Sequence, residues 1–478
     1  MSRAPILSPL IKTSFLRQAG VAVIGLLGLS ALAADNRDPL ATQSLIPPRT
    51  GSMSQSRDIC GTPATAGPVT LAQVVDRALC NNPQTRAAWA SARAQAAQVG
   101  VARGGFLPSV TGTVGFNRSR SENSVGVATE FNQGTGSLSA SYVLFDFGAR
   151  DAALQAALES LTATNYTLDA TLQRIFLSAV QAYFNLFATR AAIDASRIAE
   201  QSSAESLKAA TARQQAGTTT PADRLQAQTA YSQAVLNRIQ AEGNARNAQG
   251  ALANIMGLDA NQVVDLALPN LLIPDEQFDR NLEALIAEAR KRRPDLAAAE
   301  AQVRAAQANV DAARSSGRPV VSLTGNLNAA DTSLARPTNT QAVGVTLSIP
   351  LFSGHIPAYR TEAARAQAEN QEAQRDTLSQ QVALDVWQAH ANLTTNAQAV
   401  RSSADLLASA TESERMASGR YRAGVGNIID VLTAQSALAN ARQQNIQAIY
   451  NWHSARASLA RAMGQLDASA LDRYRAGP

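Results

Sequence analysis

Two very long helical stretches constrain the fold of this 478-residue chain more than any other feature. From Arg150 to Gln215 the sequence contains neither proline nor glycine, and Tyr359–Arg422 is a second run of similar length. Apolar residues recur along both runs in steps of three and four, which is the pattern of a coiled coil. At 1.5 Å per residue each helix would be about 100 Å long. Helices of this length build a rod or a tube, and the low aromatic content of 5% fits walls one helix thick.

The two stretches belong to a tandem duplication that organises the whole chain. Residues of the first half recur in the second half at one constant spacing: Arg213 and Arg420, Gly217 and Gly424, Asp223 and Asp430, Met256-Gly257 and Met463-Gly464. Such repetition indicates two copies of one structural unit. We predict a first repeat over residues 71–264, a linker over 265–281, a second repeat over 282–466 and a C-terminal tail over 467–478.

Each repeat also contains a pair of amphipathic strands. Apolar and small polar residues alternate in Val320–Asn328 and Gln341–Leu351, and again in Val110–Phe116 and Leu138–Leu144. Strands of about ten residues with this alternation are long enough to cross a membrane. An ordinary half-buried hairpin of a soluble sheet would show the same pattern. The segments between the paired strands, residues 119–137 and 329–340, are predicted to be loops.

Strands in a membrane must form a closed barrel, and this requirement limits what these four strands can do. Four strands are too few for a membrane barrel, whose smallest known size is about eight. An open sheet in lipid would leave the backbone groups of its edges unpaired, which is prohibitively costly. If the strands span a membrane, several chains must therefore share one barrel.

The N-terminus has the pattern of a secretory signal peptide. Arg3, Lys12 and Arg17 precede an apolar run over Ala19–Leu29, and small residues follow at Ala31-Leu32-Ala33. We predict cleavage after residue 33 and an N-terminal extension over residues 34–70; an N-terminal membrane anchor is the alternative. Loss of three basic residues lowers the net charge of +5 to +2, which gives no reason to expect a nucleic-acid partner.

The chain has two cysteines, Cys60 and Cys80. In an exported protein an even pair without metal-like partners is most simply a disulfide, here tying the N-terminal extension to the first helix. Two unpaired thiols are the alternative, and either role is structural.

No pattern typical of catalysis is present. His355, His390 and His453 are scattered, without the spacing of metal ligands. Phosphate-binding and nucleophile-elbow motifs are also absent. We therefore expect no enzyme activity, no cofactor and no metal. Tyr183, Trp387 and Trp452 lie within helical seams and are expected in the core.

The order of these elements resembles one family, the TolC-type outer-membrane factors. The resemblance covers residues 71–466 and is carried by short motifs in a specific order: Asn81-Asn82-Pro83, Val143-Leu144-Phe145-Asp146-Phe147-Gly148, Arg293-Pro294-Asp295-Leu296, Leu351-Phe352-Ser353-Gly354, Tyr421-Arg422-Ala423-Gly424 and Ile429-Asp430-Val431-Leu432. It implies a mixed α+β membrane protein: a homotrimer whose four strands per chain close a twelve-stranded β-barrel in the outer membrane. Its long coiled-coil helices would form a tunnel in the periplasm.

The resemblance also implies partners. The helix–turn–helix tips, Ala216–Asp223 and Ala423–Asp430, would meet a periplasmic adaptor and an energised inner-membrane transporter. Arg213 with Gly217, and Arg420 with Gly424, fit the adaptor-contact pattern of the family. A plain helix C-terminus would also favour this arginine and this glycine.

Asp430 matches the position at which these tunnels place an acidic constriction, and Asp223 is its counterpart in the first repeat. Three carboxylates at a narrow entrance would favour cations. The second acid that the family places one turn onward is replaced by Thr433. The alternative is helix capping, because Thr220 and Asn427 are expected N-caps and both aspartates would then lie in the first helical turn.

The predicted function is a passive exit duct in the outer membrane, with the helical part in the periplasm. Protein secretion beside an ABC transporter is favoured, because no lipoprotein cysteine follows the leader and the layout resembles exporters of large toxins of the cyclase-haemolysin type. Small-molecule efflux beside a proton-driven pump is the first alternative. A periplasmic coiled-coil adaptor or structural protein is the second. The cargo is not readable from the sequence.

Overall fold

The computed structural model describes residues 38–49, 60, 67–122, 128–267 and 281–466. The predicted leader, the C-terminal tail and most of the linker lie outside these residues. The chain divides into two compact units. The sheet unit comprises residues up to Leu45, Gln95–Glu159 and Arg304–Ala368; the helical unit comprises Ile46–Ala94, Ser160–Val303 and the chain from Glu369 onward. Both predicted repeats therefore contribute to both units.

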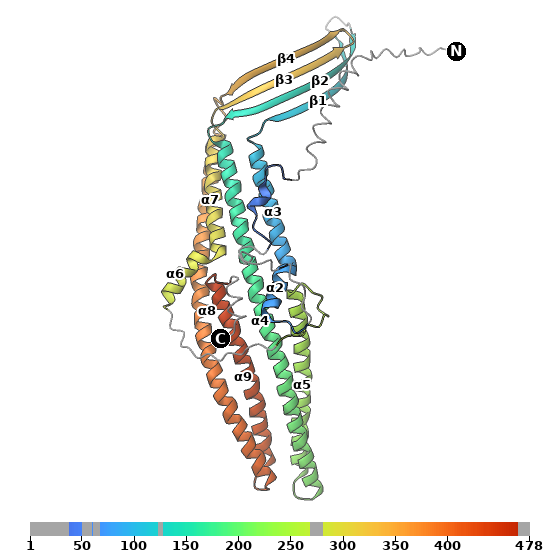
Figure 1. The fold of residues 1–478 in the computed structure, drawn as a ribbon, viewed down its shortest axis with the longest axis vertical. Helices are drawn as coiled ribbons and strands as arrows, with labels where there is room; N and C mark the ends of the chain where they lie inside the picture. The colour runs from blue at the N-terminus through green and yellow to red at the C-terminus, as the bar shows by residue number, and fades with distance from the viewer. Residues whose placement is uncertain (1–37, 50–59, 61–66, 123–127, 268–280, 467–478) are drawn as a thin grey trace, which may run out of the picture. The chain divides into compact units, whose positions relative to one another are not determined.

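The helices of the two halves match in length, pair by pair (Figure 1). The short helices α2 (Leu71–Asn81) and α6 (Leu282–Arg292) have 11 residues each. Those that begin at a proline, α3 (Pro83–Gly104) and α7 (Pro294–Ser315), have 22. The long helices α4 (Ala149–Gln215) and α8 (Ile356–Arg422) have 67, and the returning helices α5 (Pro221–Ile255) and α9 (Ile428–Ala462) have 35. A short 3-10 helix, η1, spans Thr42–Leu45. Within the described ranges, no helix combines the length and hydrophobicity needed to cross a membrane.

The strands form one antiparallel sheet in the order β1-β2-β3-β4. Its members are β1 (Ser109–Glu122), β2 (Ala128–Phe145), β3 (Val320–Thr332) and β4 (Ala335–Ser348). The central pair β2 and β3 joins the two halves of the chain, with Leu138 opposite Leu327. The four strands were predicted, but the loops predicted over residues 119–137 and 329–340 were wrong. Most of these residues continue the strands, because polar side chains alternate there and the register runs on, for example from Arg120 to Glu130.

The corner between β2 and α4 explains where the strand ends and the helix begins. Asp146 is buried and its Oδ2 accepts hydrogen bonds from the backbone N and the Nε of Arg150, at 3.1 and 2.8 Å. Between them Phe147 and Gly148 adopt positive φ angles of 53° and 85°, which turn the chain sharply. The Arg150 guanidinium also lies 4.9 Å from the ring centroid of Phe106. The carboxylate thus satisfies donors of the first helical turn, as an N-terminal cap does.

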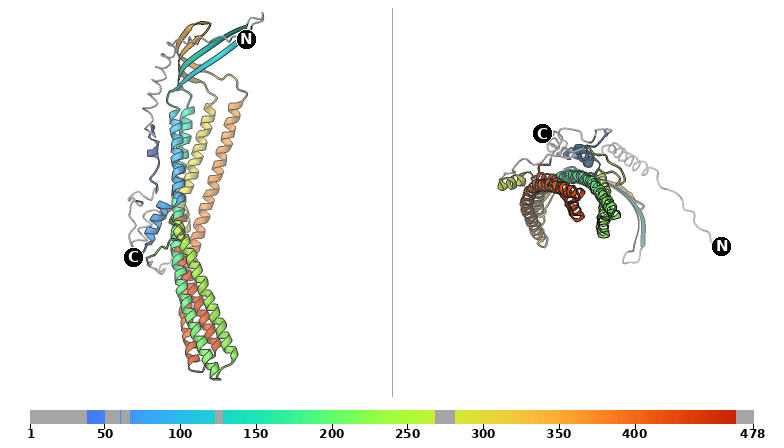
Figure 2. Two further views of the ribbon diagram at one scale, coloured as in Figure 1. Left: turned by 90° about the vertical axis from the view of Figure 1, so that its right-hand side faces the viewer. Right: turned by 90° about the horizontal axis from the view of Figure 1, so that it is seen from below.

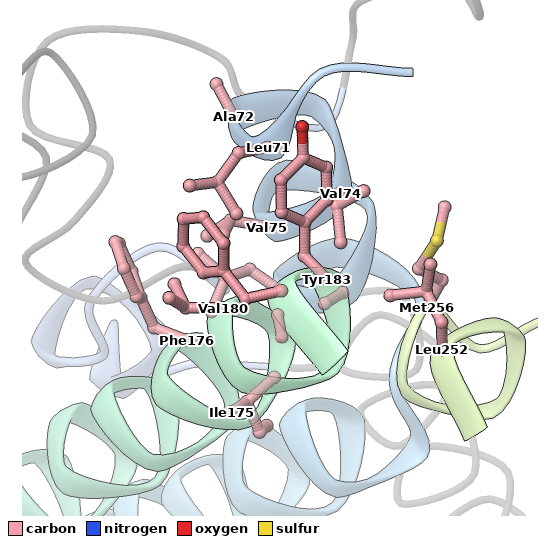
Figure 3. Close-up of a cluster of buried hydrophobic side chains, with 14 of the residues drawn as sticks. Leu71, Ala72, Val74, Val75, Ile175, Phe176, Val180, Tyr183, Leu252 and Met256 are labelled. Atoms are coloured by element: carbon pink, nitrogen blue, oxygen red, sulfur yellow. The ribbon is translucent and has the colours of Figure 1, made fainter. Parts of the chain in front are cut away.

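The first core of the helical unit lies where α2 packs against α4 and the end of α5 (Figure 3). Val74 and Val75 of α2 are fully buried against Phe176 and Tyr183 of α4. The Tyr183 hydroxyl donates to the backbone oxygen of Ala267 at 2.9 Å, and burial raises its pKa to about 12. Each large apolar side chain buried here contributes about 1.5–3 kcal/mol.

A second core joins α6, α8 and α9, beside a buried arginine. Arg293 is 5% exposed and donates to Asp295 at 2.5 and 3.0 Å and to Asp385 of α8 at 2.7 Å. Burial alone would lower the pKa of Arg293, but these hydrogen bonds outweigh it and raise the pKa. The Arg293-Pro294-Asp295 motif supplies one carboxylate to the guanidinium and α8 supplies the other, and this pairing makes burial of the charge tolerable.

Two glycines end α5 and α9 in the same way. Gly257 and Gly464 have φ angles of 72° and 69°. A Cβ at Gly257 would lie 2.7 Å from the backbone oxygen of Asn81, and one at Gly464 would lie 2.8 Å from that of Arg292. The repeated Met-Gly pair therefore lets each returning helix end directly against the residues that precede a proline-started helix.

Candidate functional site

The helix–turn–helix tips of the helical unit share one turn geometry. Gly217 follows α4 with a φ of 74°, and Gly424 follows α8 with a φ of 78°. The next residue in each turn donates its backbone N–H back to an arginine carbonyl, Thr218 to Arg213 and Val425 to Arg420, both at 3.0 Å. This is the left-handed glycine cap expected as the structural role of these glycines.

The two turns differ in how their aspartates are used. Thr220 caps α5 by accepting from the backbone N of Asp223, and Asp223 Oδ2 accepts from the backbone N of Thr220 at 3.3 Å. Asn427 caps α9 by accepting from Ile429 at 3.0 Å and does not engage Asp430. Both N-cap predictions are confirmed. Asp223 is half-buried within a reciprocal capping box, whereas Asp430 is exposed.

The two arginines also differ. The Arg213 Nη2 donates to the backbone oxygen of Tyr421 at 2.6 Å, and its guanidinium lies 4.0 Å from the centroid of the Tyr421 ring. Tyr421 is 6% exposed and packs with Ile428 and Val431 at the base of the second turn. Arg420 is exposed. Arg213 therefore ties the two turns of one chain together, a contact that the matched sequence positions did not reveal.

Two shallow grooves lie near the tips, one beside each returning helix. One has a volume of about 560 Å³ between α5 and α9, and the other has about 490 Å³ along α5. Ile429, Leu432 and Thr433 line the first, and Leu225 and Thr229 line the second. Ile429 and Leu225 are each about half exposed, so the tips present apolar surface as well as charge.

Three described residues of the N-terminal extension contact α2 and α3. In the sheet unit, Arg103 of α3 donates to the backbone oxygen of Leu40 at 2.9 Å. In the helical unit, the Arg49 guanidinium lies 5.2 Å from the ring centroid of Trp89, and Cys60 is joined to Cys80 of α2 by a disulfide. No cysteine is free. The disulfide joins Cys60 of the extension to the first helix, as predicted. Two unpaired thiols were the alternative that the sequence left open.

The sheet has one apolar and one polar face. Val114, Phe116, Val343 and Val345 share the apolar face and are between 66% and 83% exposed. Water-exposed apolar surface of this extent is unfavourable, and a lipid environment removes the cost. The opposite face carries hydroxyl and amide side chains, for example in the row Thr113, Ser137 and Asn328. These two faces suit a sheet with lipid on one side and water on the other.

The described residues contain no cluster of three or more His, Cys, Asp or Glu placed to hold a metal ion. His453 is a strongly perturbed titratable group among the described residues. It is 4% exposed and stacks on Phe184, with ring centroids 4.3 Å apart. Burial, and to a lesser extent the positive charge of Arg456, lowers its pKa to about 4. A neutral imidazole packed on an aromatic ring is a core residue.

Comparisons with known proteins agree with this architecture. The family described as outer membrane efflux protein matches residues 74–258 and 285–465. Protein CyaE of Bordetella pertussis is 32% identical over 407 residues, which are 84% of this chain and 85% of the relative. The pyoverdine export outer membrane protein OpmQ of Pseudomonas aeruginosa is 29% identical over 399 residues, 79% of this chain and 81% of the relative.

The fold is shared with solved channels. The Campylobacter jejuni CmeC outer membrane channel matches with a TM-score of 0.75 at 20% identity, covering 88% of this chain and 92% of that one. The outer-membrane channel OprN matches with a TM-score of 0.74 at 20% identity, covering 86% and 96%. The chain therefore belongs to the outer membrane efflux protein family, as an outer-membrane channel and not the periplasmic adaptor that its sequence left open.

Proposed function

We propose that three copies of this chain form the exit duct of a type I protein secretion system. The first support is the sheet, in which β1 and β4 each have a partner on one side only. In lipid these free edges must pair, and the strand that each needs is the opposite edge of another copy. Three copies would supply twelve strands, within the range of closed membrane barrels.

The helical unit offers a matching contact between copies. Figure 1 shows α8 and α5 on opposite sides of the lower part of this unit, and Figure 2 shows the helices from two further directions. Leu225 and Leu236 of α5, and Met416 and Leu406 of α8, are between 45% and 59% exposed. Leu225 and Met416 each lie eight residues from the glycine of their own turn, and Leu236 and Leu406 lie nineteen and eighteen residues from it. Pairing α5 with α8 of the next copy would bury both sets at the same height.

Trp387 also lies on α8, and its exposure contradicts the prediction that it belongs to the core. Tyr183 and Trp452 are buried as expected, but Trp387 is 54% exposed on α8. A heptad pattern identifies an apolar seam without saying whether the seam is covered by the same chain or by another.

The tips support docking of a periplasmic adaptor and, through it, of an inner-membrane transporter. Arg420 and Gly424 precede the start of α9, where Ile429, Leu432 and Thr433 line the groove between α5 and α9. This groove offers apolar and hydrogen-bonding groups to a partner helix. Arg213 and Gly217 hold the first turn, with Arg213 already engaged by Tyr421. We therefore assign adaptor contact to the Arg420 turn first. An ABC transporter suits protein cargo, and a proton-driven pump suits small-molecule efflux, the alternative that the name of OpmQ favours.

We assign an acidic gate at the tunnel entrance to Asp430 on one observation. Asp430 is exposed at the start of α9, while its counterpart Asp223 is held in a capping box. In a trimer three Asp430 carboxylates would ring the entrance and attract cations. Asp430→Ala is expected to raise single-channel conductance in a planar bilayer and to weaken block by divalent cations. Asp223→Ala is the matched control and should lower stability by about 1 kcal/mol through loss of the capping box, with divalent block retained. Unchanged conductance and unchanged block in Asp430→Ala would remove the gate assignment.

A further inference from the structure

The side chains of five rows on the polar face of the sheet are all uncharged, a property that the proposed duct does not require. Strand pairing aligns its side chains in rows across the sheet, for instance Ser109 with Ser141 and Thr324, and Thr111 with Ser139 and Asn326. Three further rows continue the pattern, through Thr113, Ser137, Asn328 and Thr340, through Gly115, Thr135, Ala330 and Thr338, and through Asn117, Gln133 and Thr332. None of these five rows contains a charged side chain.

The charges of the sheet lie elsewhere. Arg118 and Arg120 share the face of Val114 and Phe116, beyond the apolar band, and both pair with Glu130 at 3.0 and 3.4 Å. Arg336 lies at the register shift between β3 and β4, outside the five rows. The strands therefore carry both signs of charge, but none of the charged side chains lies in the five polar rows.

The hydroxyl groups of the polar face remain partly available. Ser139 Oγ donates to the backbone oxygen of Thr111 at 3.4 Å, and Thr135 Oγ1 donates to that of Gly115 at 3.4 Å. These are long hydrogen bonds, and each hydroxyl oxygen keeps lone pairs that can accept from water or cargo. A surface of this kind exchanges hydrogen bonds without holding an ion or an apolar group in place.

We propose that this face makes the membrane exit a charge-neutral passage lined by hydroxyl and amide groups, which admits hydrated polypeptide irrespective of its charge. This inference rests on the proposed function, because it places the polar face toward the lumen. It deepens that function by naming the cargo class, an extended and hydrated chain, and by placing charge selection outside the sheet. A duct for lipophilic molecules would gain from an apolar or aromatic lining, and the five rows provide none.

Peptide block in a planar bilayer tests the inference. The trimer is reconstituted in the Asp430→Ala background, so that the tip carboxylates are absent. Oligo-arginine or oligo-aspartate of equal length is then added on the extracellular side. The unmodified sheet should be blocked by both peptides at rates within about threefold of each other. Thr113→Asp adds one carboxylate per copy to the polar face and should slow entry of oligo-aspartate by about tenfold while speeding entry of oligo-arginine. Thr113→Asn, neutral and of similar size, should match the parent.

Ser139→Asp on the neighbouring strand repeats the test if Thr113→Asp fails to assemble, which trimer migration on gels would reveal. Tenfold discrimination by the parent sheet would overturn the inference, as would charged variants that alter the entry of neither peptide. Absence of any conductance would instead refute the proposed duct, so the two failures are distinguishable.

Discussion

Replacing His453 with leucine should remove one component of the acid sensitivity of the helical unit. The imidazole lies between α9 and α4, stacked on Phe184, and neither of its ring nitrogens has a hydrogen-bond partner. Protonation would place a positive charge in this apolar site, near the positive charge of Arg456. Burial therefore lowers the pKa to about 4, from an ordinary value of 6.5.

The direction and size of the effect follow from these two values. The imidazole binds a proton more weakly in the folded protein than in the unfolded chain. Protonation therefore lowers the free energy of unfolding: it is highest above pH 6.5 and falls as the pH drops toward 4. The loss per protomer is about 2 kcal/mol at pH 5 and about 3 kcal/mol at pH 4. Leucine has nearly the volume of histidine and does not titrate, so the variant should lack this component.

The assay is the urea midpoint of the detergent-solubilised trimer, measured at pH 7.5, 6.0, 5.0 and 4.0. Protonation of carboxylates shifts the midpoint in both proteins, so the informative quantity is the difference between parent and His453→Leu at each pH. That difference should move in favour of the variant as the pH falls. His390→Leu, at a half-buried histidine of α8, controls for loss of an imidazole. Equal pH dependence of parent and His453→Leu would refute the reasoning.

Two further changes test the fold and the assembly. Gly464→Ala should destabilise the helical unit by at least about 1–2 kcal/mol in the same urea assay, because alanine is strained at a φ of 69° and its Cβ would approach the backbone oxygen of Arg292; an unchanged midpoint would contradict this. Leu236→Cys combined with Leu406→Cys should give a covalent trimer on a non-reducing gel, since no native cysteine is free to compete. Each single variant should run as a monomer, and an intact trimer that never cross-links would rule out the pairing of α5 with α8.

Much of the fold could be predicted because its signals are local. Alternation marks the strands, uninterrupted heptads mark α4 and α8, and the caps at Thr220 and Asn427 follow from residue type. The strands were predicted too short because apolar alternation stops where the strand leaves the hydrophobic band. Strand pairing continues there, since it depends on the partner strand and not on hydrophobicity.

The candidate site was less predictable because its decisive contacts join distant parts of the chain. Arg213 and Arg420 are equivalent by sequence position, yet it is Arg213, distant in sequence, that contacts Tyr421. Asp223 and Asp430 are likewise equivalent, and the difference lies in the cap: a threonine side chain permits the reciprocal box with Asp223, whereas Asn427 bonds to Ile429. A pattern of matched residues identifies positions but does not assign each member of a pair its role.

These differences indicate that the two turns of the duplicated chain have different roles. In the first turn both charged residues are used internally, Arg213 on Tyr421 and Asp223 on its own helix start. In the second turn the equivalent residues, Arg420 and Asp430, are exposed. A trimer built from two identical turns would present six equivalent tips. The proposed trimer would instead present three tips held by internal contacts and three with exposed charged groups. Arg213 of the first turn thus holds Tyr421 at the base of the second. If the proposed gate and adaptor contact lie at the second turn, alteration of Arg213 should change divalent block and adaptor affinity together.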